Sequence, residues 1–163
     1  MDSSAGPVRD DELDAVRELY REYRAYIESL YPIRPFEDGE IAGLPGRYRL
    51  FVLRRDGQVS GCVAWHVLGD GVAEMKRLYV RPATRGQGGG RRLAELVIAD
   101  VRREGYQVLR LDTLEAMTGA IALYRSLGFT EIENYHGRPL PWALFFELRI
   151  ADSSAGGGTP KAP

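Results

Sequence analysis

Residues 74–93, EMKRLYVRPATRGQGGGRRL, decide the fold of this chain. The run VAEMKRLYV, which stops at Pro82, predicts a strand, and the apolar spacing after Gly88 predicts a helix. Between them stand three consecutive glycines flanked by arginines. A helix N-terminus presents unpaired N–H groups and partial positive charge, and glycines let the backbone approach an anion closely. We therefore predict a phosphate site, with pyrophosphate as the favoured ligand, over the alternative of a plain loop.

Two widespread nucleotide motifs fit this loop poorly. The string GxxxxGK[ST], which marks a P-loop, is missing from the sequence. Gly86 and Gly88 begin a GxGxxG pattern, but Arg91 stands where the third glycine is required. Asp112 could serve as the ribose-binding acid, although it lies further along the chain than usual. The antiparallel strands predicted upstream also argue against a dinucleotide-binding domain.

Elements on both sides of the loop predict an α/β fold. Helices are expected within residues 11–30, 31–46, 88–104 and 116–128, and strands at 48–55, 59–68, 72–80, 107–113, 130–135 and 142–150. The first three strands form an antiparallel meander, and a crossover joins residues 74–80 to 108–112 in parallel. Residues 1–150 form one domain, and the Gly/Ser/Pro-rich residues 151–163 form a disordered tail.

Composition excludes several classes of protein. The net charge of −1 gives no support for general binding to nucleic acid or membrane surfaces. No apolar run is long enough to span a bilayer, and the acidic N-terminus does not resemble a signal peptide. A single cysteine, Cys62, rules out an intramolecular disulfide framework, and with only two histidines beside it the sequence argues against a structural zinc site. We expect a cytoplasmic protein that uses no metal.

The loop and a second segment together resemble a known family. The spacing Arg85-x-x-Gly88-x-Gly90 matches the Q/R-x-x-G-x-G/A signature of the GNAT superfamily of N-acetyltransferases, and RLDTLEAMTGAIALYRSLGF at 110–129 is similar to the same core. The resemblance covers roughly residues 48–150. It implies a mixed, mainly antiparallel sheet with a central splay, flanked by helices. It also implies direct transfer of an acetyl group from acetyl-CoA to a primary amine.

The resemblance implies two parts of the acetyl-CoA site. Backbone amides of the loop would hold the pyrophosphate, and these belong to Arg85, Gly86, Gln87, Gly88, Gly89, Gly90 and Arg91. The strand before the loop would pair its backbone with the pantetheine amides, which assigns Leu78, Tyr79 and Val80.

The resemblance also implies catalytic groups. Tyr124 occupies the position of a tyrosine that protonates the leaving thiolate, although a tyrosine packed by its ring has the same pattern. Glu74 occupies the position of a general base, with a solvent-facing strand glutamate as the alternative. His66 on the neighbouring strand is a competing base. Met117 replaces a family asparagine, so Asp112 or Thr113 would take over that contact.

The acceptor is expected between the N-terminal helices and the loop before the last strand. Candidate rim residues are Arg24, Tyr26, Tyr31, Tyr135, His136, Arg138 and Trp142. Mixed arginine and tyrosine suit a small anionic amine such as an amino acid. Two other functions stay open, a non-catalytic acyl-CoA sensor and a nucleotide-dependent oxidoreductase. The apolar last strand allows a homodimer, but a core strand has the same pattern.

Overall fold

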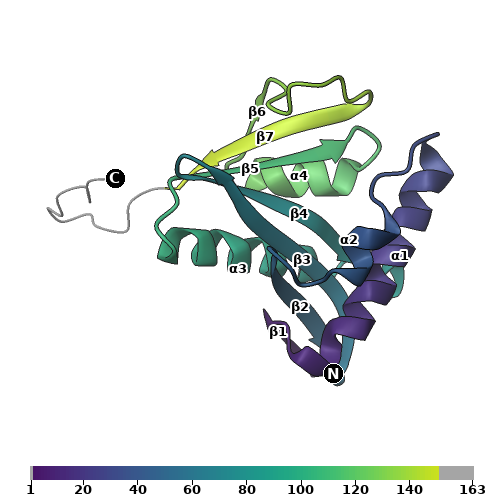
Figure 1. Ribbon diagram of the computed structural model, residues 1–163. Coiled ribbons are helices and arrows are strands. Elements are labelled where there is room, and N and C mark those ends of the chain that lie inside the picture. Colours follow the sequence, from purple (N-terminus) through teal and green to yellow (C-terminus); the bar gives the residue numbers. More distant parts are fainter. Residues whose placement is uncertain (1, 151–163) are drawn as a thin grey trace, which may run out of the picture.

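A computed structural model describes residues 2–150 as one seven-stranded sheet with helices on both faces (Figure 1). The predicted tail, 151–163, lies outside the described residues. In chain order the strands and α-helices are β1 (Ser3–Pro7), α1 (Leu13–Leu30), α2 (Asp38–Ala42), β2 (Arg49–Arg55), β3 (Gln58–Gly69), β4 (Val72–Val80), α3 (Gly89–Arg103), β5 (Val108–Leu114), α4 (Thr118–Ser126), β6 (Thr130–Ile132) and β7 (Ala143–Arg149). Short 3₁₀ turns precede α1 and follow β4.

The sheet has the order β1-β2-β3-β4-β5-β7-β6. Its neighbours are antiparallel except β4 and β5, which are parallel and joined by the crossover through α3. The predicted meander, crossover and mixed α/β class are therefore confirmed. The strand predicted at 130–135 is shorter than expected, because only Thr130–Ile132 pairs with β7.

β4 and β5 pair only at their beginnings. The parallel register covers Val72 with Val108, Ala73 with Leu109 and Glu74 with Arg110, and then stops. Beyond Glu74 the two strands diverge, as Figure 1 shows. The predicted central splay is confirmed. It leaves the later backbone groups of β4 without a strand partner on the β5 side.

Two apolar cores cover opposite faces of the sheet. Alternate residues of β2 divide between them, with Phe51 and Leu53 packed under α3 and α4 and Leu50 and Val52 packed under α1 and α2. Side chains alternate across a strand, so a strand covered on both faces is apolar throughout. This explains the nearly continuous apolar run in β2, and it fixes the helices that carry the site.

A buried carboxylate attaches α3 to the sheet. The side chain of Asp100 accepts hydrogen bonds from Trp65 Nε1 at 2.8 Å and from Arg49 Nε at 2.8 Å. Asp100 is 1% exposed, so its charge requires these donors. The contacts hold the helix whose first residues form the glycine-rich loop.

The sequence patterns did not predict β1. Ser3–Pro7 pairs antiparallel with β2 at the sheet edge. The segment SSAGP has no β-branched or aromatic residue, and these are the residues that strands favour. Backbone pairing to the free edge of β2 holds it, and that pairing leaves no signal in the side chains.

Candidate active site

The glycine-rich loop has the backbone shape of an anion site. Gly88 caps α3 with φ +79, and Gly86 has φ +82, so both occupy the left-handed region. The amide of Arg92 makes the first bond of the helix, to the carbonyl of Gly88. The amides of residues 89–91 therefore lie in the turn that has no intrahelical acceptors. They point out of a helix N-terminus, where an anion is favoured.

Of the next two glycines, packing requires only the first to lack a side chain. A Cβ on Gly89 would lie 2.5 Å from Leu53 Cδ2, so Gly89 lets α3 approach β2 closely. A Cβ on Gly90 would lie 3.5 Å from Leu123 Cδ2, which is an ordinary contact. The sequence pattern could not separate these roles, because the neighbours come from β2 and α4.

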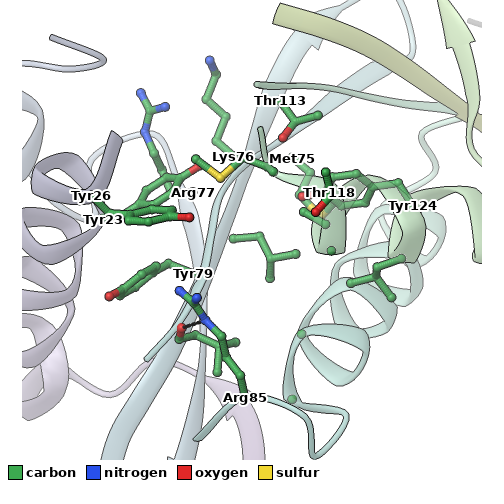
Figure 2. A pocket seen from close by; sticks show the side chains of 18 of the residues that line it. Tyr23, Tyr26, Met75, Lys76, Arg77, Tyr79, Arg85, Thr113, Thr118 and Tyr124 are labelled. Atoms are coloured by element: carbon green, nitrogen blue, oxygen red, sulfur yellow. Dashed lines mark hydrogen bonds between the residues drawn. The ribbon is translucent and has the colours of Figure 1, made fainter. Parts of the chain in front are cut away.

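A cleft of about 410 Å³ extends from this loop into the splay. Leu78, Tyr79 and Val80 of β4 line it, together with Arg85, Gly86, Gly88, Gly89 and Gly90 of the loop. Gln87 and Arg91 are not among its lining residues. Figure 2 shows Tyr23 and Tyr79 on one side of the cleft and Thr118 and Tyr124 on the other. The unpaired part of β4 runs between them.

The two loop arginines have different surroundings. Arg85 Nε donates to the carbonyl of Val80 at 2.8 Å, and its guanidinium lies 5.7 Å from the ring centroid of Tyr79. Arg91 Nη2 donates to Ser126 Oγ at the end of α4. Arg85 therefore places a positive charge at the cleft, while Arg91 joins the loop to α4.

A β-bulge in β4 directs the Arg77 side chain toward α2. The register against β3 shifts between Cys62 and Ala64, and Arg77 opposite has φ +59. The Arg77 side chain forms a bidentate pair with Glu40 of α2, at 2.9 and 3.1 Å. The bulge therefore redirects the strand at the splay and connects it to the N-terminal helices.

Tyr124 lies on α4 where the resemblance placed it, and it lines the cleft. Its ring packs against Phe129 and Phe146, with centroids 5.7 and 6.3 Å away. Burial raises the pKa of Tyr124 well above the ordinary range of tyrosine, so the hydroxyl stays protonated. Both the packing and the acid interpretations agree with this placement.

A second cavity, of about 870 Å³, lies on the other side of the splay. His66, Glu74, His136 and Arg138 line it, together with residues of the segment between α1 and α2. The two cavities share six lining residues, which are Tyr23, Met75, Lys76, Arg77, Asp112 and Thr113. They therefore meet where β4 and β5 separate.

Several predicted rim residues lie elsewhere. Tyr26 lines the first cleft, and Arg24 pairs with Asp38 at 2.8 Å. The hydroxyl of Tyr31 accepts a hydrogen bond from the amide of Ala116, and its ring lies 5.3 Å from that of Trp142. This contact joins α1 to the C-terminal half of the sheet.

Glu74 is the centre of a buried polar cluster. One carboxylate oxygen lies 2.8 Å from His66 Nε2 and 3.4 Å from Lys76 Nζ. The other accepts a hydrogen bond from the Tyr135 hydroxyl at 2.6 Å and lies 3.3 Å from His136 Nε2. Glu74 is only 1% exposed, so the interpretation as a solvent-facing glutamate is wrong.

The cluster sets the charge state of Glu74. Burial raises the pKa of this carboxyl. Hydrogen bonds from His66 and Tyr135 and the charge of Lys76 lower it by more, so that the pKa is about 2. Conversely, burial and the neighbouring carboxylate raise the pKa of Tyr135 well above its usual range. At neutral pH Glu74 is therefore an anion surrounded by donors.

His136 connects this cluster to β5. Its Nε2 lies 2.8 Å from Asp112 Oδ2 as well as 3.3 Å from Glu74 Oε2. Atoms of Glu74, Asp112 and His136 that could bind a cation all lie within 4.8 Å of one another. Sequence reasoning missed this grouping, because its members come from β4, β5 and the loop between β6 and β7.

None of the helices in residues 2–150 is long and apolar enough to cross a membrane. Comparison with known proteins shows the family. The Acetyltransferase (GNAT) family matches residues 13–129. An IAA acetyltransferase from Azospirillum brasilense is 37% identical over 139 residues, which cover 82% of this chain and 90% of that protein.

Further relatives agree. An uncharacterized N-acetyltransferase from Schizosaccharomyces pombe is 37% identical over 121 residues, 70% of this chain and 74% of its own length. A phosphinothricin acetyltransferase from Sinorhizobium meliloti, solved in complex with AcCoA, has the same fold, with a TM-score of 0.75 at 20% identity over 99% of this chain and 95% of that one. The chain described here therefore belongs to the GNAT family and is an acetyl-CoA-dependent N-acetyltransferase.

Proposed function

We propose that the protein transfers the acetyl group of acetyl-CoA directly to the primary amine of a small anionic molecule, such as an amino acid. The observation that carries the proposal is that two cavities meet at the splay of β4 and β5. A donor in one cavity and an acceptor in the other would face each other there. Holding two reactants in line needs no covalent enzyme intermediate.

The first cleft would hold acetyl-CoA. Its loop presents free amides and Arg85 to the pyrophosphate, and the unpaired backbone of Leu78–Val80 offers strand-like hydrogen bonds to the pantetheine. A β4 amide at the splay would polarise the thioester carbonyl.

Tyr124 would protonate the departing thiolate. Burial raises the pKa of its phenol, but the thiolate leaves into the same apolar surroundings, which raise the proton affinity of sulfur as well. The pKa values of the phenol and of the departing thiol therefore stay close to each other, which favours proton transfer between them.

The second cavity would hold the acceptor. Arg47 and Arg138 are exposed at its rim, and neither forms an ion pair within residues 2–150, whereas Arg34 pairs with Glu37 at 3.0 Å. The carboxylates Glu74 and Asp112 lie at the inner end. An ammonium group would be drawn inward and a carboxylate held at the rim, which is the charge pattern of an amino acid.

Thiol release from acetyl-CoA with a panel of amines tests this proposal. We expect each amino acid to have at least a tenfold higher kcat/KM than its uncharged amide, and Arg138→Gln to remove most of that preference. The control Arg21→Gln changes an exposed α1 arginine, paired with Glu18 and outside both cavities, and should keep it. Equal rates for acids and amides would contradict the anionic acceptor.

The same experiments would also identify a non-catalytic sensor, which is the alternative function. It requires that acetyl-CoA bind, measured by calorimetry, while no amine in the panel releases thiol. Relatives in the family are named for different acceptors, IAA in one case and the alanine of ribosomal protein bS18 in another, so the panel includes an alanine-initiated peptide.

A further inference from the structure

We propose that Asp112 and His136 form the proton-accepting pair of the reaction, and that Glu74 is a positioning residue that holds them. This inference rests on the proposed transfer to an amine. It changes the assignment of the base from Glu74, the residue that the family resemblance indicated, to a pair formed by β5 and the β6–β7 loop.

Position favours Asp112. It is the only carboxylate of residues 2–150 that lines both cavities, and it lies two residues after Arg110, the last β5 residue that pairs with β4. The amine nitrogen and the thioester carbon must meet at that junction. Glu74 lines only the acceptor cavity. A group that receives a proton during attack must be within hydrogen-bond reach of the nitrogen, directly or through one water.

Chemistry disfavours Glu74 itself. Both of its oxygens already have close partners, His66 and Lys76 on one and Tyr135 and His136 on the other. The same partners stabilise the anion, and a carboxylate so well stabilised has little affinity for a proton. The arrangement suits a fixed negative charge that orients Tyr135 and His136.

His136 is held as an oriented base would be. Its backbone amide donates to Asn134 Oδ1 at 2.8 Å, and its ring lies against Tyr135, with centroids 4.5 Å apart. Its Nε2 faces Asp112, and its side chain is 21% exposed, so it reaches both the cavity and solvent. An imidazole oriented by a carboxylate is a recurring arrangement for proton transfer near neutral pH.

The proton balance is simple. The substrate ammonium loses one proton to the imidazole of His136, beside Asp112, and the imidazole passes that proton to solvent before the amine attacks. The free amine attacks the thioester carbon, so a C–N bond forms. The tetrahedral adduct then loses its second N–H proton to the pair and its C–S bond breaks. The thiolate takes a proton from Tyr124, which is restored by solvent.

Charged and titratable groups around His136 come from four parts of the fold. They are Glu74 and Lys76 of β4, Asp112 and Arg110 of β5, His66 of β3, and Tyr135 of the same loop. The kcat–pH profile of the wild type should therefore rise with pH through the titration of the whole cluster. The variants identify which member is responsible.

His136→Ala and Asp112→Asn are the decisive variants. We expect kcat at neutral pH to fall about 10²- to 10³-fold in each, because a positioned base contributes that order of magnitude. The acidic limb of the profile should disappear in His136→Ala, and added imidazole should restore part of its activity. Glu74→Gln should lower kcat but keep the acidic limb of the kcat–pH profile, with its midpoint at a different pH. Acetyl-CoA affinity and melting temperature are measured for each variant.

Each outcome has one meaning. A wild type that releases no thiol with any amine refutes the proposed function and, with it, this inference. An active wild type with an unchanged pH limb in His136→Ala overturns the pair alone, and loss of that limb in Glu74→Gln or His66→Gln assigns the base to that residue instead. If Asp112→Asn fails to fold, His136→Ala still tests the pair, because residue 136 lies in a partly exposed loop. Rescue of this variant by imidazole supports the pair, and absence of rescue contradicts it.

Discussion

Replacement of Gly88 by alanine tests whether the glycine-rich loop needs the backbone conformation of Gly88 or only the space that its missing side chain leaves. Gly88 has φ +79, and a Cβ added to it would meet nothing within 4 Å. The only cost is therefore the left-handed conformation, about 1–2 kcal/mol for a residue with a Cβ. Gly90→Ala is the matched control, because Gly90 lies inside α3 and its added Cβ would make an ordinary contact with Leu123.

The expected result is a difference between the two variants. Both change glycine to alanine, so the effect on the unfolded chain is common to them. If the loop keeps its shape, Gly88→Ala should unfold with a free energy about 1–2 kcal/mol lower than Gly90→Ala. If the free loop relaxes instead, that strain appears on binding, and CoA affinity falls roughly fivefold to thirtyfold.

Two measurements decide between these cases. Urea denaturation gives the free energy of unfolding, and calorimetry gives the affinity for CoA. For Gly88→Ala relative to Gly90→Ala, the loss of unfolding free energy and the loss of CoA-binding free energy should together equal the strain energy. Equal stability and equal affinity in both variants would refute the role assigned to the backbone of Gly88.

Three further predictions follow from the same structure. Tyr124→Phe should lower kcat roughly 10- to 100-fold with little change in acetyl-CoA affinity, since only a hydroxyl is removed; full activity would return Tyr124 to a packing role. The pKa of Glu74 is depressed from 4.5 to about 2, so its stabilising effect is complete above pH 4.5 and is lost as the pH falls toward 2. Glu74→Gln should therefore show a shallower fall of unfolding free energy over that pH range, measured by urea denaturation. Acetyl-CoA at about 100 times its Kd should add roughly 2.7 kcal/mol to the free energy of unfolding, whereas a larger rise in Tm with NAD would contradict the assigned ligand.

The shape of the glycine-rich loop was predictable because its determinants are local. Glycine spacing, the strand that stops at Pro82 and the helix pattern after Gly88 lie within one short segment, and the structure places them as expected. The reason that Gly89 must be small was not predictable, because Leu53 comes from another strand.

The polar cluster around Glu74 was less predictable because it is assembled from distant segments. Tyr135 and His136 reach Glu74 and Asp112 through a loop that follows the last helix. In the sequence they are two polar residues among prolines, and no periodicity marks them. Likewise, Arg24 was expected to face the substrate, but Asp38 lies beside it instead.

The splay also divides the chain into parts that can change at different rates in evolution. The cleft that we assign to acetyl-CoA is formed largely by the continuous stretch from β4 to α4, whereas the cavity that we assign to the acceptor draws on the segment after α1 and the loop before β7. Mutations in those two acceptor segments can reshape one cavity without moving the glycine-rich loop. A lineage of such enzymes can therefore keep one acyl donor while acquiring new acceptors, and sequence drift should concentrate in residues 33–48 and 133–143.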